Sequence, residues 1–133
     1  SAATNRLRRS TDGGATWQSI AFFDQAWAFG YGKAAAPGGY PTVFVYGRAA
    51  SGAAWGVWRS SDAGASWARV ADYPLGLFDI VTTVTGDPEV FGKVYVGFSG
   101  NSFAAGAPAD ATPPPPPPAP PAAPVASPRA GRY

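Results

Sequence analysis

The sequence predicts an all-β fold built from a repeated unit of about fifty residues. Two stretches carry the repeat, because STDGGATW at residues 10–17 returns as SSDAGASW at residues 60–67. Short segments of alternating or β-branched residues surround them, and Gly, Pro or Asp turn signals separate these segments. No segment shows the period of an amphipathic helix. A constant repeat length is typical of architectures in which neighbouring units share one core.

Each copy of the repeated stretch predicts a tight turn. Asp12 and Asp62 can accept hydrogen bonds from backbone N–H groups two or three residues further on, helped by the preceding serine hydroxyls. The glycines permit a positive φ, and the closing tryptophans are expected to fold their rings back over the turns. A repeated aspartate could also be a catalytic acid or a metal ligand, but beside repeated glycines it favours turn formation. The predicted structural residues are Ser10, Asp12, Gly14, Thr16, Trp17, Ser60, Asp62, Gly64, Ser66 and Trp67.

The remaining segments read in order as strands and connections. Strands are expected at residues 7–9, 17–20, 27–31, 42–46, 56–59, 67–70, 80–84 and 93–98. The segment TVFVY at residues 42–46 is apolar on both faces, which predicts a strand buried between two neighbouring sheets. Residues 33–41 and 48–54 are predicted loops, and residues 22–24 and 72–77 are predicted connections.

The repeated pattern S-x-D-x-G-x-T-W resembles the Asp-box of sialidase-type β-propellers, with Ser66 replacing Thr in the second copy. The resemblance implies blades of four antiparallel strands, with an Asp-box turn between the third and the fourth strand. We therefore expect about two blades: one complete blade from residues 26–70, the outer half of the blade before it, and the inner half of the blade after it. Because propellers use four to eight blades, we expect the chain to be marginally stable alone and to pack against further blades.

Composition excludes several classes of function. The 133 residues include no Cys, His or Met, which removes thiolate metal sites and the most common general base. We expect no cofactor and no bound metal. The ten basic and eight acidic residues are scattered, so no nucleic-acid partner is expected. No apolar run is long enough for a membrane span. The absence of an initial Met is expected for a fragment or a processed piece.

The composition changes abruptly after residue 106. Residues 107–133 are rich in proline and include the uninterrupted run at residues 113–118. Because proline fixes φ and lacks an N–H, this segment is expected to be a disordered, extended polyproline tail. We therefore divide the chain into a partial propeller, residues 1–106, and a proline-rich linker, residues 107–133. The linker is expected to be a stiff spacer to another module, with an SH3-type ligand as the alternative.

Several phrases resemble a narrower family, glycoside hydrolase family seventy-four. They are YGKAAAP at residues 31–37, YPTVFVYG at residues 40–47, GVWRS at residues 56–60 and TGDPEVFGKVYVG at residues 85–97. The resemblance covers roughly residues 7–98. These residues resemble the late part of the C-terminal propeller of that family. The family comprises secreted xyloglucanases and related endo-β-1,4-glucanases, in which two seven-bladed propellers flank a substrate cleft. It usually continues with an Asn-Gly-Arg-Gly-like segment, where this chain has SGNSF at residues 99–103.

The resemblance implies a fragment of an extracellular, inverting glycoside hydrolase that acts on β-1,4-glucan or xyloglucan. The fragment would contribute propeller scaffold and a candidate part of the cleft wall. The two catalytic Asp residues of that family lie in upstream blades, and no position here matches their motifs. We therefore assign no catalytic residue and predict that this chain alone is inactive. The alternative is a non-catalytic Asp-box propeller that binds a protein or carbohydrate partner.

Three residues are candidates for contact with the substrate. In a four-stranded meander, alternate connections emerge at opposite ends of the blade. Arg48, Trp55 and Tyr73 fall at the end opposite the Asp-box turns, which is the cleft face in the resembled enzymes. An exposed indole ring at Trp55 could stack on a sugar face. Packing of Trp55 between blades is the competing interpretation.

Overall fold

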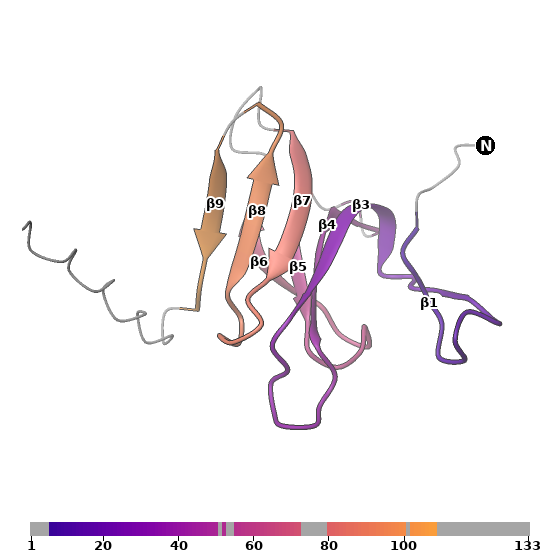
Figure 1. Cartoon of the computed structure of the whole chain (residues 1–133). Helices are drawn as coiled ribbons and strands as arrows, with labels where there is room; N and C mark the ends of the chain where they lie inside the picture. Colours follow the sequence, from indigo (N-terminus) through magenta and orange to yellow (C-terminus); the bar gives the residue numbers. More distant parts are fainter. Residues whose placement is uncertain (1–5, 51, 53–54, 73–79, 101, 109–133) are drawn as a thin grey trace, which may run out of the picture.

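The computed structural model describes residues 6–50, 52, 55–72, 80–100 and 102–108, and within them the fold is all-β. Figure 1 shows three antiparallel sheets arranged side by side along the chain. The strands are β1 Arg8–Arg9, β2 Gln18–Ser19, β3 Phe23–Gly32, β4 Thr42–Ala49, β5 Gly56–Ser60, β6 Ala68–Asp72, β7 Val81–Gly86, β8 Val94–Phe98 and β9 Phe103–Gly106. We call β1–β2 the first sheet, β3–β4–β5–β6 the second sheet and β7–β8–β9 the third sheet.

The repeat predicted from the sequence is confirmed by the order of the strands. One Asp-box turn joins β1 to β2 and the other joins β5 to β6, so both lie between the last two strands of a sheet. The second sheet is a complete four-stranded meander, and the first sheet matches the outer half of such a meander. This is the order expected for successive propeller blades.

The third sheet differs from the prediction, which expected only the two inner strands of a blade there. It has a third strand, β9, which pairs with β8 from Gly97↔Phe103 to Val94↔Gly106. The N–H of Phe98 donates to the carbonyl oxygen of Ser102 at 3.4 Å, which closes the connection between the two strands. The sequence FAAG contains no β-branched residue, so propensity alone gave no sign of this strand. Its position depends on pairing with β8.

The ends of β3 and β4 also differ from the prediction. β3 begins at Phe23 instead of residue 27, and β4 continues to Ala49, so Arg48 lies on a strand and not in the predicted loop. Phe23 pairs with Ala49, and both side chains are buried. The register shifts between Phe23 and Gln25, and a β-bulge of this kind breaks the alternation that sequence patterning relies on.

The second and third sheets meet at their innermost strands, β3 and β7. Three glycines, Gly30, Gly32 and Gly86, allow this close approach. A Cβ atom on Gly30 would lie only 2.1 Å from the carbonyl oxygen of Val84. Just beyond the end of β3, the N–H of Lys33 donates to the carbonyl oxygen of Asp87 at 2.8 Å. The backbones themselves therefore set the distance between the two sheets.

Two apolar clusters fill the spaces between the sheets, as the two-faced segment at residues 42–46 predicts. Phe44 and Tyr46 pack toward the third sheet, in a cluster completed by Val57, Val81, Val84, Val94 and Val96. Val45 lies in the other cluster, which contacts Leu7 and Ile20 next to the first sheet. β4 is thus buried on both faces between neighbouring sheets.

Candidate functional site

The two Asp-box turns join the last two strands of the first and of the second sheet, and their geometry is nearly the same in both copies. Asp12 Oδ1 accepts from the Thr16 N–H at 2.9 Å, and its Oδ2 accepts from the Thr16 hydroxyl at 2.6 Å. Asp62 makes the same two contacts with Ser66. The N–H groups lie four residues beyond the aspartate, not two or three as the sequence analysis expects. Each turn is closed by its own side chains.

Glycines and tryptophans complete these turns. Gly14 and Gly64 have φ of 96° and 88°, in the left-handed region that glycine adopts without strain. The indole N–H of Trp17 donates to the Gly14 carbonyl oxygen at 3.0 Å, and Trp67 donates to Gly64 at 3.2 Å. Both rings therefore fold back over their turns, as the sequence predicts.

Hydrogen bonding controls the ionisation of both Asp-box carboxylates. The Thr16 hydroxyl and backbone N–H, followed by Ser10, lower the pKa of Asp12 from 3.8 to about 2. The Ser66 hydroxyl and backbone N–H, followed by Ser60, lower the pKa of Asp62 in the same way to about 2. A general acid in glycoside hydrolysis needs a raised pKa. The lowered pKa values therefore favour a structural role for both side chains.

These shifts predict an acid-dependent loss of stability. Because the pKa is lowered on folding, the stabilisation is complete above the unfolded value of 3.8 and is lost as the pH falls toward about 2. We expect the urea midpoint of the wild-type chain to fall more steeply over this pH range than that of Asp62→Asn. Asp72→Asn is the control, because Asp72 is 79% exposed in an ion pair with Arg69. Parallel pH profiles for the wild type and Asp62→Asn would contradict the role of the carboxylate.

The opposite end of the second sheet carries an ion pair between its first two strands. The guanidinium of Arg48 donates from Nη2 to Asp24 Oδ2 at 2.7 Å and from Nε to Oδ1 at 3.1 Å. The hydrogen bond from Arg48 is the main cause of the lowered pKa of Asp24. The side chains of Arg48 and Asp24 are 39% and 24% exposed, so both remain accessible to solvent. Sequence reasoning missed this pair, because it requires the register of β3 on β4.

Trp55 lies at the same end as Arg48. Gly47 pairs with Gly56, which places Arg48 and Trp55 one residue beyond that pair on neighbouring chain segments. The Trp55 ring is half-buried against the cluster between the second and third sheets, with its centroid 5.1 Å from that of Tyr46. Its carbonyl oxygen accepts from Arg69 Nη2 at 2.9 Å. The third candidate, Tyr73, lies outside the described residues.

A fourth aspartate, Asp87, holds the turn between β7 and β8. Asp87 accepts from the backbone N–H groups of Glu89 and Val90 at 2.8 and 2.9 Å, and from the Tyr95 hydroxyl at 2.9 Å. These bonds, with that from Glu89 the largest, lower its pKa to about 2. Across the described residues, no three acidic, His or Cys side chains gather into a group that could hold a metal ion. The same residues contain no helix able to cross a membrane.

Comparisons with known proteins agree on one family. The chain is 38% identical over 92 residues to the xyloglucanase Xgh74A of Acetivibrio thermocellus. The matched region spans 69% of this chain and 11% of that protein. It is 39% identical over 94 residues to a xyloglucanase of a Paenibacillus species, spanning 71% of this chain and 9% of that protein. The chain thus spans about a tenth of the length of these curated relatives. No family model matches the chain.

Solved structures give the same result. The GH74 enzyme of Niastella koreensis superposes with a TM-score of 0.64 at 34% identity, over 77% of this chain and 15% of the enzyme. The GH74 xyloglucanase of Xanthomonas campestris superposes with a TM-score of 0.62 at 36% identity, over 76% of this chain and 14% of the enzyme. The fold of about three quarters of this chain therefore matches that of these enzymes.

Proposed function

We propose, from the premise that this chain is a propeller segment of glycoside hydrolase family seventy-four, that it works within a longer secreted enzyme that cleaves xyloglucan or a related β-1,4-glucan. The observation that carries the proposal is the likeness to xyloglucanases and GH74 enzymes, which covers 69% of this chain in sequence and 77% in structure. The alternative of a non-catalytic Asp-box propeller is not favoured by these relatives.

The part played by this chain is the scaffold and not the acid–base chemistry. Inverting hydrolysis needs a carboxylic acid with a raised pKa and a carboxylate about 6.5–9.5 Å away. The environment has the opposite effect on four described aspartates: the pKa values of Asp12, Asp24, Asp62 and Asp87 are all lowered. Each of these carboxylates already holds a turn or an ion pair. We therefore place the catalytic acids in other parts of the longer enzyme.

An exposed aromatic face supports packing against further blades. Trp27, Phe29 and Tyr31 on β3 are each more than half exposed. They line a groove of about 700 Å³, together with Leu7 and Ile20, which lie next to the first sheet. The apolar cluster between the first and second sheets continues into this groove. The missing inner strands of the preceding blade would cover this face in the longer enzyme.

The end that carries Arg48 and Trp55 is the candidate wall of the substrate cleft. The guanidinium of Arg48 keeps N–H groups near solvent while it is oriented by Asp24, and the half-buried Trp55 ring is held by Tyr46. Oriented polar donors beside an aromatic ring suit the hydroxyls and the apolar face of a sugar. Tyr73 is retained as a third candidate from the sequence.

Xyloglucan hydrolysis by purified proteins tests this assignment. We expect the 133-residue chain to release no new reducing ends from xyloglucan, whereas the full-length enzyme does. In the full-length enzyme, Trp55→Ala should raise KM more than it lowers kcat, because the ring binds substrate without taking part in proton transfer.

Trp17→Ala in the full-length enzyme is the matched control, because Trp17 lies at the opposite, Asp-box end. It should leave KM unchanged. Turnover by the isolated chain would overturn the scaffold role. Equal KM values for the two tryptophan variants would remove Trp55 from the cleft wall.

A further inference from the structure

Two arginines at the candidate cleft wall each form an ion pair with an aspartate. Arg48 Nη2 lies 2.7 Å from Asp24 Oδ2, and Arg69 Nη2 lies 2.9 Å from Asp72 Oδ1. The end of β4 and the end of β6 are aligned through the start of β5, which pairs with both strands. Both ion pairs therefore lie at the same end of the second sheet, opposite its Asp-box turn.

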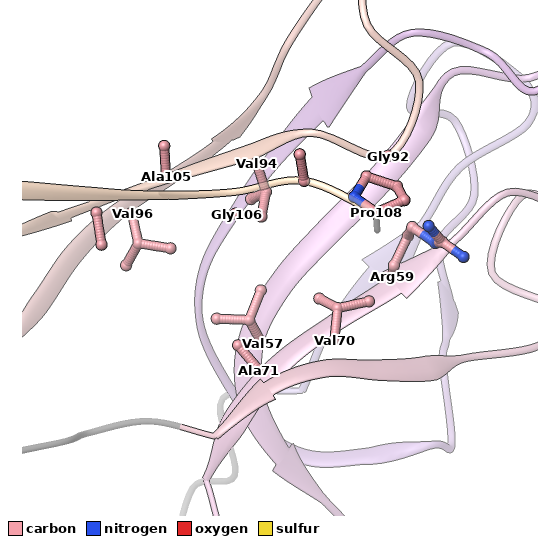
Figure 2. A pocket seen from close by; sticks show the side chains of 12 residues that line it. Val57, Arg59, Val70, Ala71, Gly92, Val94, Val96, Ala105, Gly106 and Pro108 are labelled. Atoms are coloured by element: carbon pink, nitrogen blue, oxygen red, sulfur yellow. The ribbon is translucent and has the colours of Figure 1, made fainter. Parts of the chain in front are cut away.

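The arginines that immediately precede the two Asp-boxes are held in another way. The guanidinium of Arg9 lies 5.4 Å from the centroid of the Tyr40 ring. The guanidinium of Arg59 lies 5.4 Å from the centroid of the Phe91 ring. Figure 2 shows Arg59 beside Pro108 at one end of a mainly apolar pocket of about 240 Å³ between the second and third sheets. Among the arginines that the structure describes, pairing with an aspartate thus occurs only at the candidate cleft wall.

Asp24 occupies one edge of the Arg48 guanidinium. Its Oδ1 accepts from Nε at 3.1 Å, and its Oδ2 accepts from Nη2 at 2.7 Å. A guanidinium carries five N–H groups, and those on Nη1 donate to none of the described residues. The Arg48 side chain is 39% exposed. Arg48 therefore retains donors for a ligand, while its charge is already matched by a carboxylate.

The pair of Arg48 and Asp24 carries no net charge at neutral pH. The hydrogen bond from Arg48 is the largest cause of the lowered pKa of Asp24, so the carboxylate stays ionised. A sugar hydroxyl can accept from the outer N–H groups of the guanidinium without meeting an opposing charge. A sugar carboxylate in the same place is attracted by Arg48 and repelled by Asp24, so much of the Coulomb attraction is cancelled. A like charge beside a binding group gives specificity because it acts against the unwanted ligand.

We propose that Asp24 determines specificity at the candidate cleft wall: its carboxylate cancels the charge of Arg48, so that Arg48 donates to the hydroxyls of uncharged sugars and does not attract sugars that carry carboxylates. Asp24 is a positioning residue, because it acts through Arg48 and takes no part in proton transfer. The inference rests on the proposed function, which puts Arg48 in the cleft wall. It adds the substrate class that this part of the wall selects, a neutral glucan over a uronate-bearing one.

Inhibition of the full-length enzyme by an anionic analogue tests the proposal. The analogue is a set of xyloglucan oligosaccharides whose primary hydroxyls have been oxidised to carboxylates, and neutral xyloglucan is the substrate. The measured quantity is the ratio of Ki for the oxidised oligosaccharides to KM for neutral xyloglucan. Asp24→Asn keeps the shape of the side chain and removes its charge, so this ratio should fall by about fivefold or more. The fall should shrink in about 0.5 M salt, because exposed charges are then screened.

Asp72→Asn is the matched control. It removes the same charge from the same end of the sheet and leaves Arg48 paired with Asp24. The ratio of Ki to KM should stay within about twofold of the wild type, because general surface charge has only a weak effect at this distance. Arg48→Gln is the reciprocal variant. It leaves Asp24 without its partner, so the ratio should rise.

Equal ratios for Asp24→Asn and Asp72→Asn would overturn the proposal, as would a lower Tm of Asp24→Asn with an unchanged ratio. Either result would mean that the ion pair only holds β3 to β4. If Asp24→Asn does not fold by circular dichroism, the direction of the change in Arg48→Gln decides the question. Failure of the proposed function gives a different result: Arg48→Gln then changes neither Ki nor KM. That result would overturn this inference as well.

Discussion

Replacing Trp58 with alanine is expected to lower the free energy of unfolding by about 3–5 kcal/mol, the usual cost of removing a large buried aromatic side chain. The Trp58 ring is 8% exposed and packs edge-on against Phe22 with centroids 5.0 Å apart. Its N–H donates to the Gly47 carbonyl oxygen at 3.0 Å, and the substitution would leave that buried oxygen without its donor. Urea unfolding of the wild type and the variant measures the difference.

Trp17→Ala is the control for this substitution. It removes the same kind of side chain at a position where the ring is 59% exposed. The loss in the free energy of unfolding should therefore be much smaller. Since small domains are stabilised by only about 5–15 kcal/mol, Trp58→Ala should remove a large fraction of the total. Equal losses for the two variants would show that the cluster between the first and second sheets is not a packed core.

Replacing Gly30 with alanine is expected to destabilise the chain by about 1–3 kcal/mol or more through overpacking. The added Cβ would lie 2.1 Å from the Val84 carbonyl oxygen and 2.7 Å from the Thr85 Cα, both backbone atoms. No side-chain rotation can relieve such a contact, so β3 and β7 must move apart. The Tm of the variant and the NMR signals of Val84 and Phe44 report this movement.

Gly106→Ala is the matched control for the contact at Gly30. A Cβ on Gly106 would meet only the Val94 methyl group at 3.7 Å, an ordinary van der Waals distance. This variant should keep the Tm of the wild type or exceed it, because alanine loses less backbone entropy on folding than glycine. If both alanine variants have the same Tm, the sheets are not held apart by backbone contact.

The Asp-box turns show which features of this fold can be predicted from the sequence. Every bond that closes the first turn joins residues no more than four positions apart, as in the contacts of Asp12 with Ser10 and Thr16. Interactions of such short range depend on the local residues and little on the rest of the chain. For this reason the pattern predicted the turns, the folded-back tryptophans and the propeller segment together.

The candidate cleft wall shows the limit of such reasoning. Arg48 and Asp24 are 24 residues apart, and they meet only because β4 extends past its apolar segment and pairs with a bulged β3. The sequence placed Arg48 in a loop because nothing local marks that extension. Its ion pair and the half-buried position of Trp55 become visible only with the register of the strands.

The sequence by itself determined the all-β class, the two closed turns, the two-faced strand β4 and the likeness to family seventy-four. Tertiary structure alone decided that β9 exists, that Gly30 touches the backbone of β7, and that a pocket of about 240 Å³ lies between the second and third sheets. The physical reason is the range of the interactions. Turns are closed by neighbours in the chain, whereas strand ends, close approaches and pockets depend on which distant backbones pair and how tightly their sheets pack.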